Sequence, residues 1–496
     1  MKLSSIQLFL ILLLISLTVG LSNHIWHGDA LIHTDVARDL LVLEEIVENK
    51  QLTLIGPRSS MPGVFHGPLW YYVNLIPFYL FNGNPVLMSW FWWSLSVFAA
   101  LAFLYCCNRQ TKNLTLSLLA TICFVLIEVP GSAGPTNNYL ANLFSFFPFF
   151  IWWSWIINPS FILSIIGWLS IGILVQFQMA YAFPTALLWG PVFLWKIFKD
   201  KKYTQLVSVI FFFIPLVTFI LFDLRHGWLQ VRSFISYMQL EKSDQSFYLK
   251  ILGRLKQSLF DAVNIFKLNK FINLSLIVYI FYLVKKSKDK YLNNYVLMFA
   301  YWYFGWWILS FVFSGSIWSF YYDPFAGILL FVFVVLSNKI RNVKLLFIFL
   351  SLFLLISSYQ YFYYNKDRFN SSSWKLLSQI ASESLSEKNT GYFLYSQDQF
   401  AYPLKYAFSY YSKNNPDSGA KPYIKAPITI LVKSTDDPNN PWSTSKDWQI
   451  NKIKIDIDPI EVKNYSHGYT FEKYFLNEDE LSRPVDENLV KGLEFR

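Results

Sequence analysis

The sequence predicts an all-α, polytopic membrane protein that ends in an extracytoplasmic α/β domain. Three observations predict this fold class. Hydrophobic residues make up 54% of the 496-residue chain, aromatic residues 20% and charged residues only 15%. Apolar runs near the membrane-spanning length of about 20 residues recur between residues 5 and 360. From residue 361 the hydropathy falls and Ser, Asn, Asp and Lys increase, which is typical of a separate domain in water.

About eleven transmembrane helices are expected, each bounded by Lys/Arg clusters or by Pro, Gly and Asn. Their expected ranges are 5–22, 85–107, 114–130, 139–157, 160–178, 180–197, 204–222, 271–284, 292–313, 322–337 and 343–360. Residues 1–22 also have the form of a signal peptide, because Lys2 precedes the run LFLILLLISLTVG, but we favour a retained first helix. The expected domains are the first transmembrane helix (1–22), an outer loop with interfacial helices (23–84), the transmembrane helical domain (85–360) and the extracytoplasmic α/β domain (361–496).

The positive charges set the expected orientation in the cell membrane. Short loops that hold Lys and Arg alternate along the chain, and such loops stay on the cytoplasmic side. This places the N-terminus in the cytoplasm and the C-terminal domain outside, although segment 223–270, which then lies outside, also carries several Lys and Arg. The net charge of +10 therefore reads as a topological signal, and no motif indicates a nucleic-acid partner. All three cysteines fall within expected membrane helices, so no disulfide framework is indicated.

The C-terminal domain shows both helical and strand patterns. Residues 372–385 and 402–412 are expected to be helices, and 391–396 and 428–433 strands. Residues 452–458 (KIKIDID) alternate apolar and charged side chains and predict a further strand. Asp456 and Asp458 form the only Asp-x-Asp in the chain, a spacing that nucleotide-sugar glycosyltransferases use for a metal, but we interpret them as the solvated face of that strand.

The first outer loop holds an unusual concentration of charge in the stretch IHTDVARDLL, residues 32–41. Arg38 follows Asp35 by three positions and Asp39 follows it by four, so on a helix the three side chains lie close to one face. From the charges alone, this group could be a solvated cluster that only stabilises an amphipathic helix. The same loop continues with His66, Gly67 and Pro68 at the start of a second interfacial helix. Taken alone, His66 reads as a hydrogen-bonded structural histidine.

The order of these features resembles the membrane glycosyltransferases of the GT-C fold, and within them the protein mannosyltransferase and aminoarabinose transferase-like group. The loop of that group typically reads Asp-Glu-x-Arg-Tyr-Ala and later His-Pro-Pro-Leu-Tyr-Tyr. Here residues 35–40 read Asp-Val-Ala-Arg-Asp-Leu and residues 66–71 read His-Gly-Pro-Leu-Trp-Tyr. The Glu after the first Asp is missing, so a metal site that needs adjacent carboxylates is in doubt. Asp39 could replace it from the next turn, and a divalent metal stays possible.

The resemblance implies an inverting transfer of a sugar from a polyprenyl-phosphate donor to a glycan, lipid or protein acceptor on the outer face, within membrane lipid. Asp35 would be the general base, Asp39 would position Arg38 or a metal, and His66 would orient a sugar or phosphate oxygen. Bacterial members of the group often show a stretch similar to Phe-Asp-Leu-Arg-His, which is residues 222–226 here. The candidates for binding the donor phosphate are Arg225, His226 and Arg58. The stretch also fits a basic helix end that meets lipid headgroups.

Polar and aromatic residues near the outer membrane surface complete the predicted pocket. Gln176 and Gln178 lie near the outer end of the fifth expected span, where polar side chains face a cavity or pair between helices. Tyr321 and Tyr322 lie at the outer rim, where an aromatic belt alone also explains them. Two other classes stay open: a polymerase or ligase of envelope glycans, with 223–270 as its essential outer loop, and a transporter of lipid-linked glycans. The near absence of ionisable residues inside the spans counts against the transporter.

Overall fold

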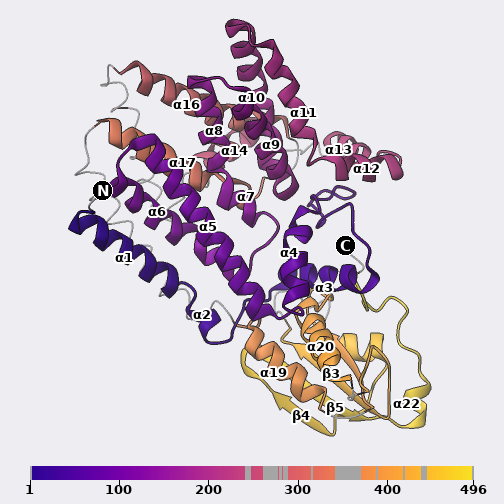
Figure 1. The fold of residues 1–496 in the computed structure, drawn as a ribbon. Helices are drawn as coiled ribbons and strands as arrows, with labels where there is room; N and C mark the ends of the chain where they lie inside the picture. The colour runs from indigo at the N-terminus through magenta and orange to yellow at the C-terminus, as the bar shows by residue number, and fades with distance from the viewer. Residues whose placement is uncertain are drawn as a thin grey trace. The chain divides into compact units, whose positions relative to one another are not determined.

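The computed structural model describes residues 3–240, 247–260, 289–313, 317–340, 370–386, 389–416, 419–436 and 444–493, and the single positions 278 and 282. These residues form two compact units (Figure 1). Unit 1 consists of Met1–Ser22, Thr53–Tyr72 and Trp92–Tyr363, and unit 2 of Asn23–Leu52, Val73–Phe91 and Tyr364–Arg496.

In the described part of unit 1, the regular secondary structure is helical. Its elements are α1 (Ser5–Gly20), α6 (Leu114–Glu128), η1 (Val129–Ala133), α7 (Tyr139–Phe144), α8 (Phe146–Ile157), α9 (Phe161–Phe177), α10 (Met179–Asp200), η2 (Tyr203–Val209), α11 (Ile210–Phe213), α12 (Val217–Arg225), α13 (Leu229–Leu240), α14 (Phe247–Phe260), α16 (Lys290–Val312), η4 (Ser319–Tyr322) and α17 (Phe325–Ile340). Two further helices, α4 (Leu69–Leu80) and α5 (Pro85–Thr111), contribute residues to both units.

The expected spans fall on helices wherever the structure describes them. The ranges 271–284, apart from two positions, and 343–360 lie outside the described residues, so the count of about eleven spans stays a prediction. Among the described residues, three helices are long and apolar enough to cross a membrane: Pro85–Thr111, Leu114–Ala133 and Tyr139–Ile157. A bent pair, Tyr203–Phe213 and Val217–Arg225, counts as a fourth if it is one span.

The bent pair corrects the expectation of one continuous helix at 204–222. Its two parts meet at an angle of 59°. The break contains Pro215, which has no backbone N–H and whose ring clashes with the preceding turn of a helix. The carbonyl of Pro215 instead accepts a hydrogen bond from the Gln176 side chain of α9. Pro215 therefore causes the bend, and a hydrogen bond from Gln176 of α9 holds it.

The aromatic residues fill the core of unit 1. The Trp152 ring stacks on the Trp189 ring at 5.5 Å between centroids and meets the Trp168 ring edge-on at 5.2 Å. Gly167 lets α9 approach this cluster, because a Cβ at that position would lie 2.8 Å from the Trp152 ring. Such ring pairs add about 0.5–1.5 kcal/mol each beyond the area that they bury.

Unit 2 contains a five-stranded sheet of order β2-β1-β3-β5-β4. Its strands are β1 (Gly391–Tyr395), β2 (Lys421–Pro422), β3 (Ile428–Ser434), β4 (Glu461–Asn464) and β5 (Tyr469–Phe475). β1 pairs in parallel with β2 and β3, whereas β5 pairs antiparallel with β3 and β4. The unit also holds α2 (Asn23–Trp26), α3 (Thr34–Asn49), α19 (Trp374–Ser384), α20 (Tyr402–Asn414), α21 (Ser445–Trp448), η7 (Gln449–Ile453), η8 (Ser466–Gly468) and α22 (Glu478–Ser482).

The structure confirms the helices and strands predicted at 372–385, 391–396, 402–412 and 428–433. The strand predicted at 452–458 is wrong: a π-helical turn ends at Ile453, and Lys454 takes a left-handed conformation with φ of 61°. The alternation of apolar and charged residues reflected burial alone, since Ile453 and Ile455 are buried and Asp456 and Asp458 are exposed. An alternating pattern does not require a strand when an irregular segment covers a sheet.

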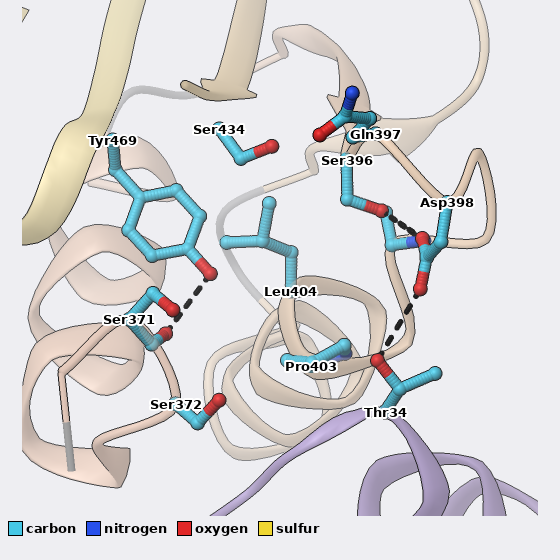
Figure 2. Close-up of a pocket in the computed structure, with 11 residues that line it drawn as sticks. Thr34, Ser371, Ser372, Ser396, Gln397, Asp398, Pro403, Leu404, Ser434 and Tyr469 are labelled. Atoms are coloured by element: carbon cyan, nitrogen blue, oxygen red, sulfur yellow. Dashed lines mark hydrogen bonds between the residues drawn. The ribbon is translucent and has the colours of Figure 1, made fainter. Parts of the chain in front are cut away.

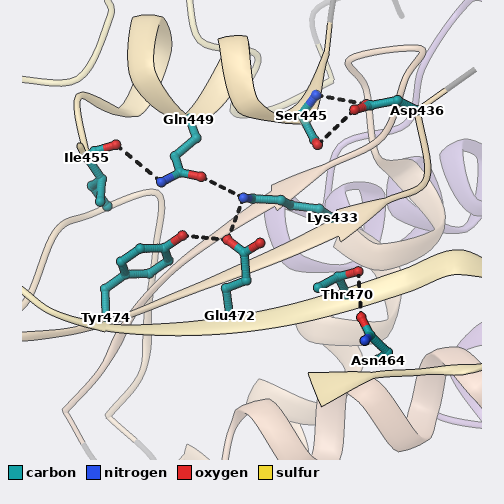
Figure 3. Close-up of polar contacts among 9 residues, drawn as sticks. All are labelled: Lys433, Asp436, Ser445, Gln449, Ile455, Asn464, Thr470, Glu472 and Tyr474. Carbon is teal, nitrogen blue, oxygen red and sulfur yellow. Dashed lines mark hydrogen bonds and ion pairs between the residues drawn. The ribbon is translucent and has the colours of Figure 1, made fainter. Parts of the chain in front are cut away.

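A buried polar network joins this irregular segment to the sheet (Figure 3). The Lys433 ammonium, on a side chain only 8% exposed, forms an ion pair with Glu472 and donates to Gln449 Oε1 at 2.6 Å. The Gln449 amide in turn donates to the Ile455 carbonyl at 3.2 Å. Because a buried charge is costly without partners, this network favours one pairing of β3 with β5.

The first loop of the chain is built into unit 2 through α19 and α20. The Asp29 carboxylate accepts from Ser373 Oγ at 2.8 Å and from the Lys375 amide at 3.0 Å, at the start of α19. Glu44 of α3 forms an ion pair with Lys413 and accepts from Ser409 Oγ at 2.7 Å, both on α20. These contacts hold α3, the helix that carries Asp35, on the C-terminal domain.

Candidate functional site

Helix α3 presents Asp35 in its first turn. Val36, Ala37 and Leu40 of α3 are buried, and the helix packs on α20. The apolar face is therefore held by unit 2, and Asp35 is left accessible to solvent. A carboxylate in the first turn is also stabilised by the partial positive charge of the helix N-terminus.

Arg38 binds both aspartates of this face. Its Nη1 lies 2.8 Å from Asp35 Oδ1, and its Nη2 lies 2.8 Å from Asp39 Oδ1. Nε donates to the same Asp39 oxygen at 3.0 Å. The side chain of Asp35 is 52% exposed, that of Arg38 16% and that of Asp39 5%. The buried Asp39 therefore holds the guanidinium, and the guanidinium orients an Asp35 carboxylate that solvent or a substrate can reach.

A metal between the two carboxylates would have to displace the Arg38 guanidinium from its position between them. In the described part of the chain, no group of three or more His, Cys, Asp or Glu side chains is arranged to hold a metal ion.

In unit 1, residues 56–67 form a tight hairpin-like turn that carries Arg58 and His66. The Gly56 amide donates to the His66 carbonyl and the His66 amide donates to the Pro57 carbonyl, each at 2.8 Å. Arg58 lies opposite Phe65 in an antiparallel bridge, and its side chain is exposed. This segment belongs to the second half of the loop that the sequence predicts to lie outside, residues 23–84.

Gln176 fastens this segment to α9. The Gly67 amide donates to the Gln176 carbonyl at 3.0 Å, and the Leu69 amide donates to Gln176 Oε1 at 3.4 Å. A Cβ on Gly67 would lie 1.9 Å from that side-chain oxygen, so only glycine fits. Gln178 lies at the start of α10, 1% exposed, and its amide nitrogen has no hydrogen-bond partner among the described residues.

The Phe-Asp-Leu-Arg-His stretch lies beside the same turn. The Phe65 ring meets the Phe222 ring edge-on at 5.7 Å, and the Phe222 ring stacks on the His226 ring at 4.1 Å. The Phe65 amide donates to Gln230 Oε1 at 3.0 Å. Arg225, the last residue of α12, is exposed. Two of the stretches singled out in the sequence therefore meet in space, although more than 150 positions separate them.

The two tyrosines of the expected outer rim differ in environment. The Tyr321 hydroxyl hydrogen-bonds Ser60 Oγ at 3.1 Å, so Tyr321 contacts the 56–67 turn. Tyr322 is only 3% exposed and packs on Trp306 and Phe325. Tyr321 is accessible to a ligand, whereas Tyr322 is part of the aromatic core.

The candidate residues thus form two groups. Unit 2 holds Asp35, Arg38 and Asp39; unit 1 holds Arg58, His66, Gln176, Gln178, Arg225, His226, Tyr321 and Tyr322. Sequence reasoning missed Gln230, for which no sequence signal exists, and a polar cleft in unit 2 at the ends of β1 and β3. Serines and an aspartate at or just after the ends of two predicted strands, at 396, 398 and 434, were the available signal for that cleft.

The helical membrane-type unit and the α/β C-terminal unit together have the architecture of the GT-C fold. No family model and no curated protein matches the chain by sequence. Its structure is similar to ArnT from Cupriavidus metallidurans bound to undecaprenyl phosphate, with a TM-score of 0.58 and 10% sequence identity over 96% of this chain and 99% of that chain. The apo state of the same ArnT gives a TM-score of 0.56 and 11% identity over 93% and 97%. The likeness in fold confirms the resemblance on which the sequence analysis relied.

Proposed function

We propose that this protein is a multi-pass membrane glycosyltransferase that moves a sugar from a polyprenyl-phosphate donor to an acceptor on the outer face of the membrane. The observation that carries the proposal is the fold, shared over 96% of the chain with a protein that was captured with undecaprenyl phosphate. The Asp35 helix, in the position along the chain where the resemblance expects it, supports the same reading. The N-terminus is cytoplasmic and unit 2 is extracytoplasmic in this proposal.

Asp35 acts as the general base. Its carboxylate takes the proton of the acceptor hydroxyl while that oxygen bonds to the anomeric carbon. The bond between the anomeric carbon and the phosphate oxygen breaks, its electron pair stays on the phosphate, and the configuration inverts. Such proton transfer typically contributes about 10²–10⁴-fold to the rate. The exposed Asp35 carboxylate, held by Arg38, suits this role.

Cationic side chains hold the phosphate that departs. Arg225 and Arg58 are exposed, and Arg can bind two phosphate oxygens at once. His226 is oriented by its Nδ1, which lies 2.8 Å from the Phe222 carbonyl, and this leaves Nε2 for the donor. His66 orients a sugar or phosphate oxygen. The polyprenyl tail lies among the apolar helices of unit 1.

The test is turnover in lipid nanodiscs with a polyprenyl-phosphate hexose and a polyprenyl-phosphate pentose as donors. Asp35→Asn should reduce turnover by about 10²–10⁴-fold, because the amide cannot take the proton. Glu48→Gln is the matched control, since Glu48 lies on the same helix, is also exposed and is also ion-paired. Full donor turnover by Asp35→Asn would show that Asp35 is not the general base. An equal loss of turnover in both variants would show that the loss comes from a disturbed helix α3 and not from a missing base.

A further inference from the structure

Unit 2 contains a polar cleft of about 490 Å³ that the proposed mechanism does not use (Figure 2). Thr34, Ser372, Ser396, Asp398, Ser434 and Tyr469 are among the residues that line it. Its volume lies within the range of about 300–1,000 Å³ that is usual for small-ligand sites.

The topology of the sheet places this β1–β3 cleft where α/β folds bind ligands. β1 lies between its two parallel neighbours, β2 and β3. The chain leaves β1 through α20 to reach β2 on one side and then crosses to β3 on the other. Gly391 permits that crossing, because a Cβ there would lie 1.9 Å from the Ile424 carbonyl oxygen. Loops at the carboxyl ends of parallel strands separate at such a switch point and leave a crevice.

The charge distribution of the cleft excludes anions. Asp398 Oδ1 accepts from Ser396 Oγ and from the amides of Phe400 and Ala401, at 3.0 and 3.3 Å, directly before α20. These amides directly precede α20, which begins at Tyr402, and the negative charge of Asp398 therefore lies beside a helix N-terminus that would otherwise attract a phosphate. Asp398 Oδ2 accepts from Thr34 Oγ1 at 3.2 Å, and in the described part of the chain no cation forms an ion pair with Asp398. A ligand here meets a fixed carboxylate beside the start of α20.

The remaining polar groups suit a ligand with many hydroxyls. The Ser372 and Ser434 side chains bring hydroxyl groups to the wall of the cleft. A hydroxyl both donates and accepts, so a polyol satisfies these groups and the outer oxygen of Asp398 together. Burial, followed by the Asp398 charge, raises the pKa of Tyr469, whose neutral hydroxyl donates to the Ser371 carbonyl at 3.0 Å. Its ring and Leu404 supply the apolar wall that the C–H face of a sugar needs.

We propose that the β1–β3 cleft binds a neutral carbohydrate, the glycan portion of the acceptor. This assignment as acceptor rests on the proposed function, whereas the preference for a neutral carbohydrate rests on the cleft alone. Thr34 links the two, because it lines the cleft and directly precedes Asp35 in the chain. Unit 2 then recognises the acceptor and carries the base that activates it.

Binding is measured with the full chain in nanodiscs prepared without glycoside detergents, on a printed array of neutral, carboxylated and phosphorylated oligosaccharides. The wild type should bind neutral members preferentially. Ser434→Phe should fill the cleft and weaken this binding at least about tenfold, a change of about 1.4 kcal/mol. Ser382→Phe is the matched control, since Ser382 is an exposed serine of α19 outside the cleft. Asp398→Asn should increase the binding of phosphorylated members, because it removes the excluding charge.

Absence of glycan binding by the wild type, equal binding by the two Phe variants, or preference for phosphorylated glycans overturns the inference. Near-UV circular dichroism checks that Ser434→Phe is folded, and the charge test with Asp398→Asn does not depend on that variant. If the protein turns over donor but binds no glycan, the inference about the cleft is wrong and the proposed function stands. Glycan binding in a protein that never turns over donor overturns the proposed function and leaves the carbohydrate preference of the cleft supported.

Discussion

Replacement of Arg38 by Met tests whether the buried ion pair of Arg38 with Asp39 contributes more to stability than the exposed pair with Asp35. The variant keeps an unbranched apolar stem but removes the cation from two carboxylates of very different exposure, Asp39 at 5% and Asp35 at 52%. A buried carboxylate that loses its partner costs about 3–5 kcal/mol, whereas an exposed pair contributes about 0–1 kcal/mol. Nearly all of the loss should therefore come from Asp39. For a unit of this size the shift in melting temperature is roughly 6–20 °C.

The assay is thermal unfolding of the purified chain, followed by differential scanning fluorimetry. Arg483→Met is the matched control, because Arg483 also pairs with an aspartate within one helical turn but both side chains are exposed, at 46% and 69%. It should lose less than about 1 kcal/mol. The double variant Arg38→Met/Asp39→Leu should recover much of the stability, since the buried carboxylate that lost the guanidinium is removed as well. Equal small losses for Arg38→Met and Arg483→Met would refute the reasoning, as would a double variant less stable than Arg38→Met.

Two further predictions concern other contacts. Gly67→Ala should destabilise the protein by about 1–3 kcal/mol and lower turnover, because the new Cβ would overlap the Gln176 side chain. Gly190→Ala is the control and should be neutral or stabilising, because the space around Gly190 is open. Identical melting curves for the two variants would contradict the predicted overlap at Gly67. Hydrogen bonds, first from Lys463, lower the pKa of Glu383 from 4.5 to about 2. A folded-state pKa below the unfolded value stabilises the fold above about pH 4.5 and loses that effect as the pH falls toward 2, so Glu383→Gln should be less stable than wild type by under about 1 kcal/mol at pH 7 and equal to it near pH 2. A difference that does not change with pH would contradict this assignment.

The fold was predictable wherever one physical term dominates. Length and hydropathy locate the membrane-type helices, since a helix needs about 20 apolar residues to cross a bilayer. Patterns of period 3.6 and 2 found the first elements of unit 2. The errors arose where two readings share a pattern: KIKIDID alternates because it covers a sheet, and the seventh span contains Pro215, whose effect on a helix was visible in the sequence. β4 lacked a clear signal, since it is exposed along its whole length.

Parts of the candidate site were predictable for the same reason. The spacing of Asp35, Arg38 and Asp39 predicted that their side chains share one helix face, and the two ion pairs confirm it. The contacts of Gln176 and Gln230 with the 56–67 turn join residues more than 100 positions apart. No local pattern contains such contacts. The catalytic role of Asp35 is a proposal that the Asp35→Asn variant tests.

The same arrangement of charge recurs in the two polar sites of unit 2. In each, a carboxylate uses one oxygen to satisfy donors of its own chain: Asp39 Oδ1 binds Arg38, and Asp398 Oδ1 binds the amides before α20. The group held in this way determines which charge or hydrogen-bonding group a ligand meets next to it. In α3 the result is an oriented, accessible carboxylate, which suits proton abstraction. In the β1–β3 cleft it is a helix start closed to phosphate, which suits a neutral polyol. A sugar acceptor needs both, because its hydroxyl must be recognised as neutral before the base removes its proton.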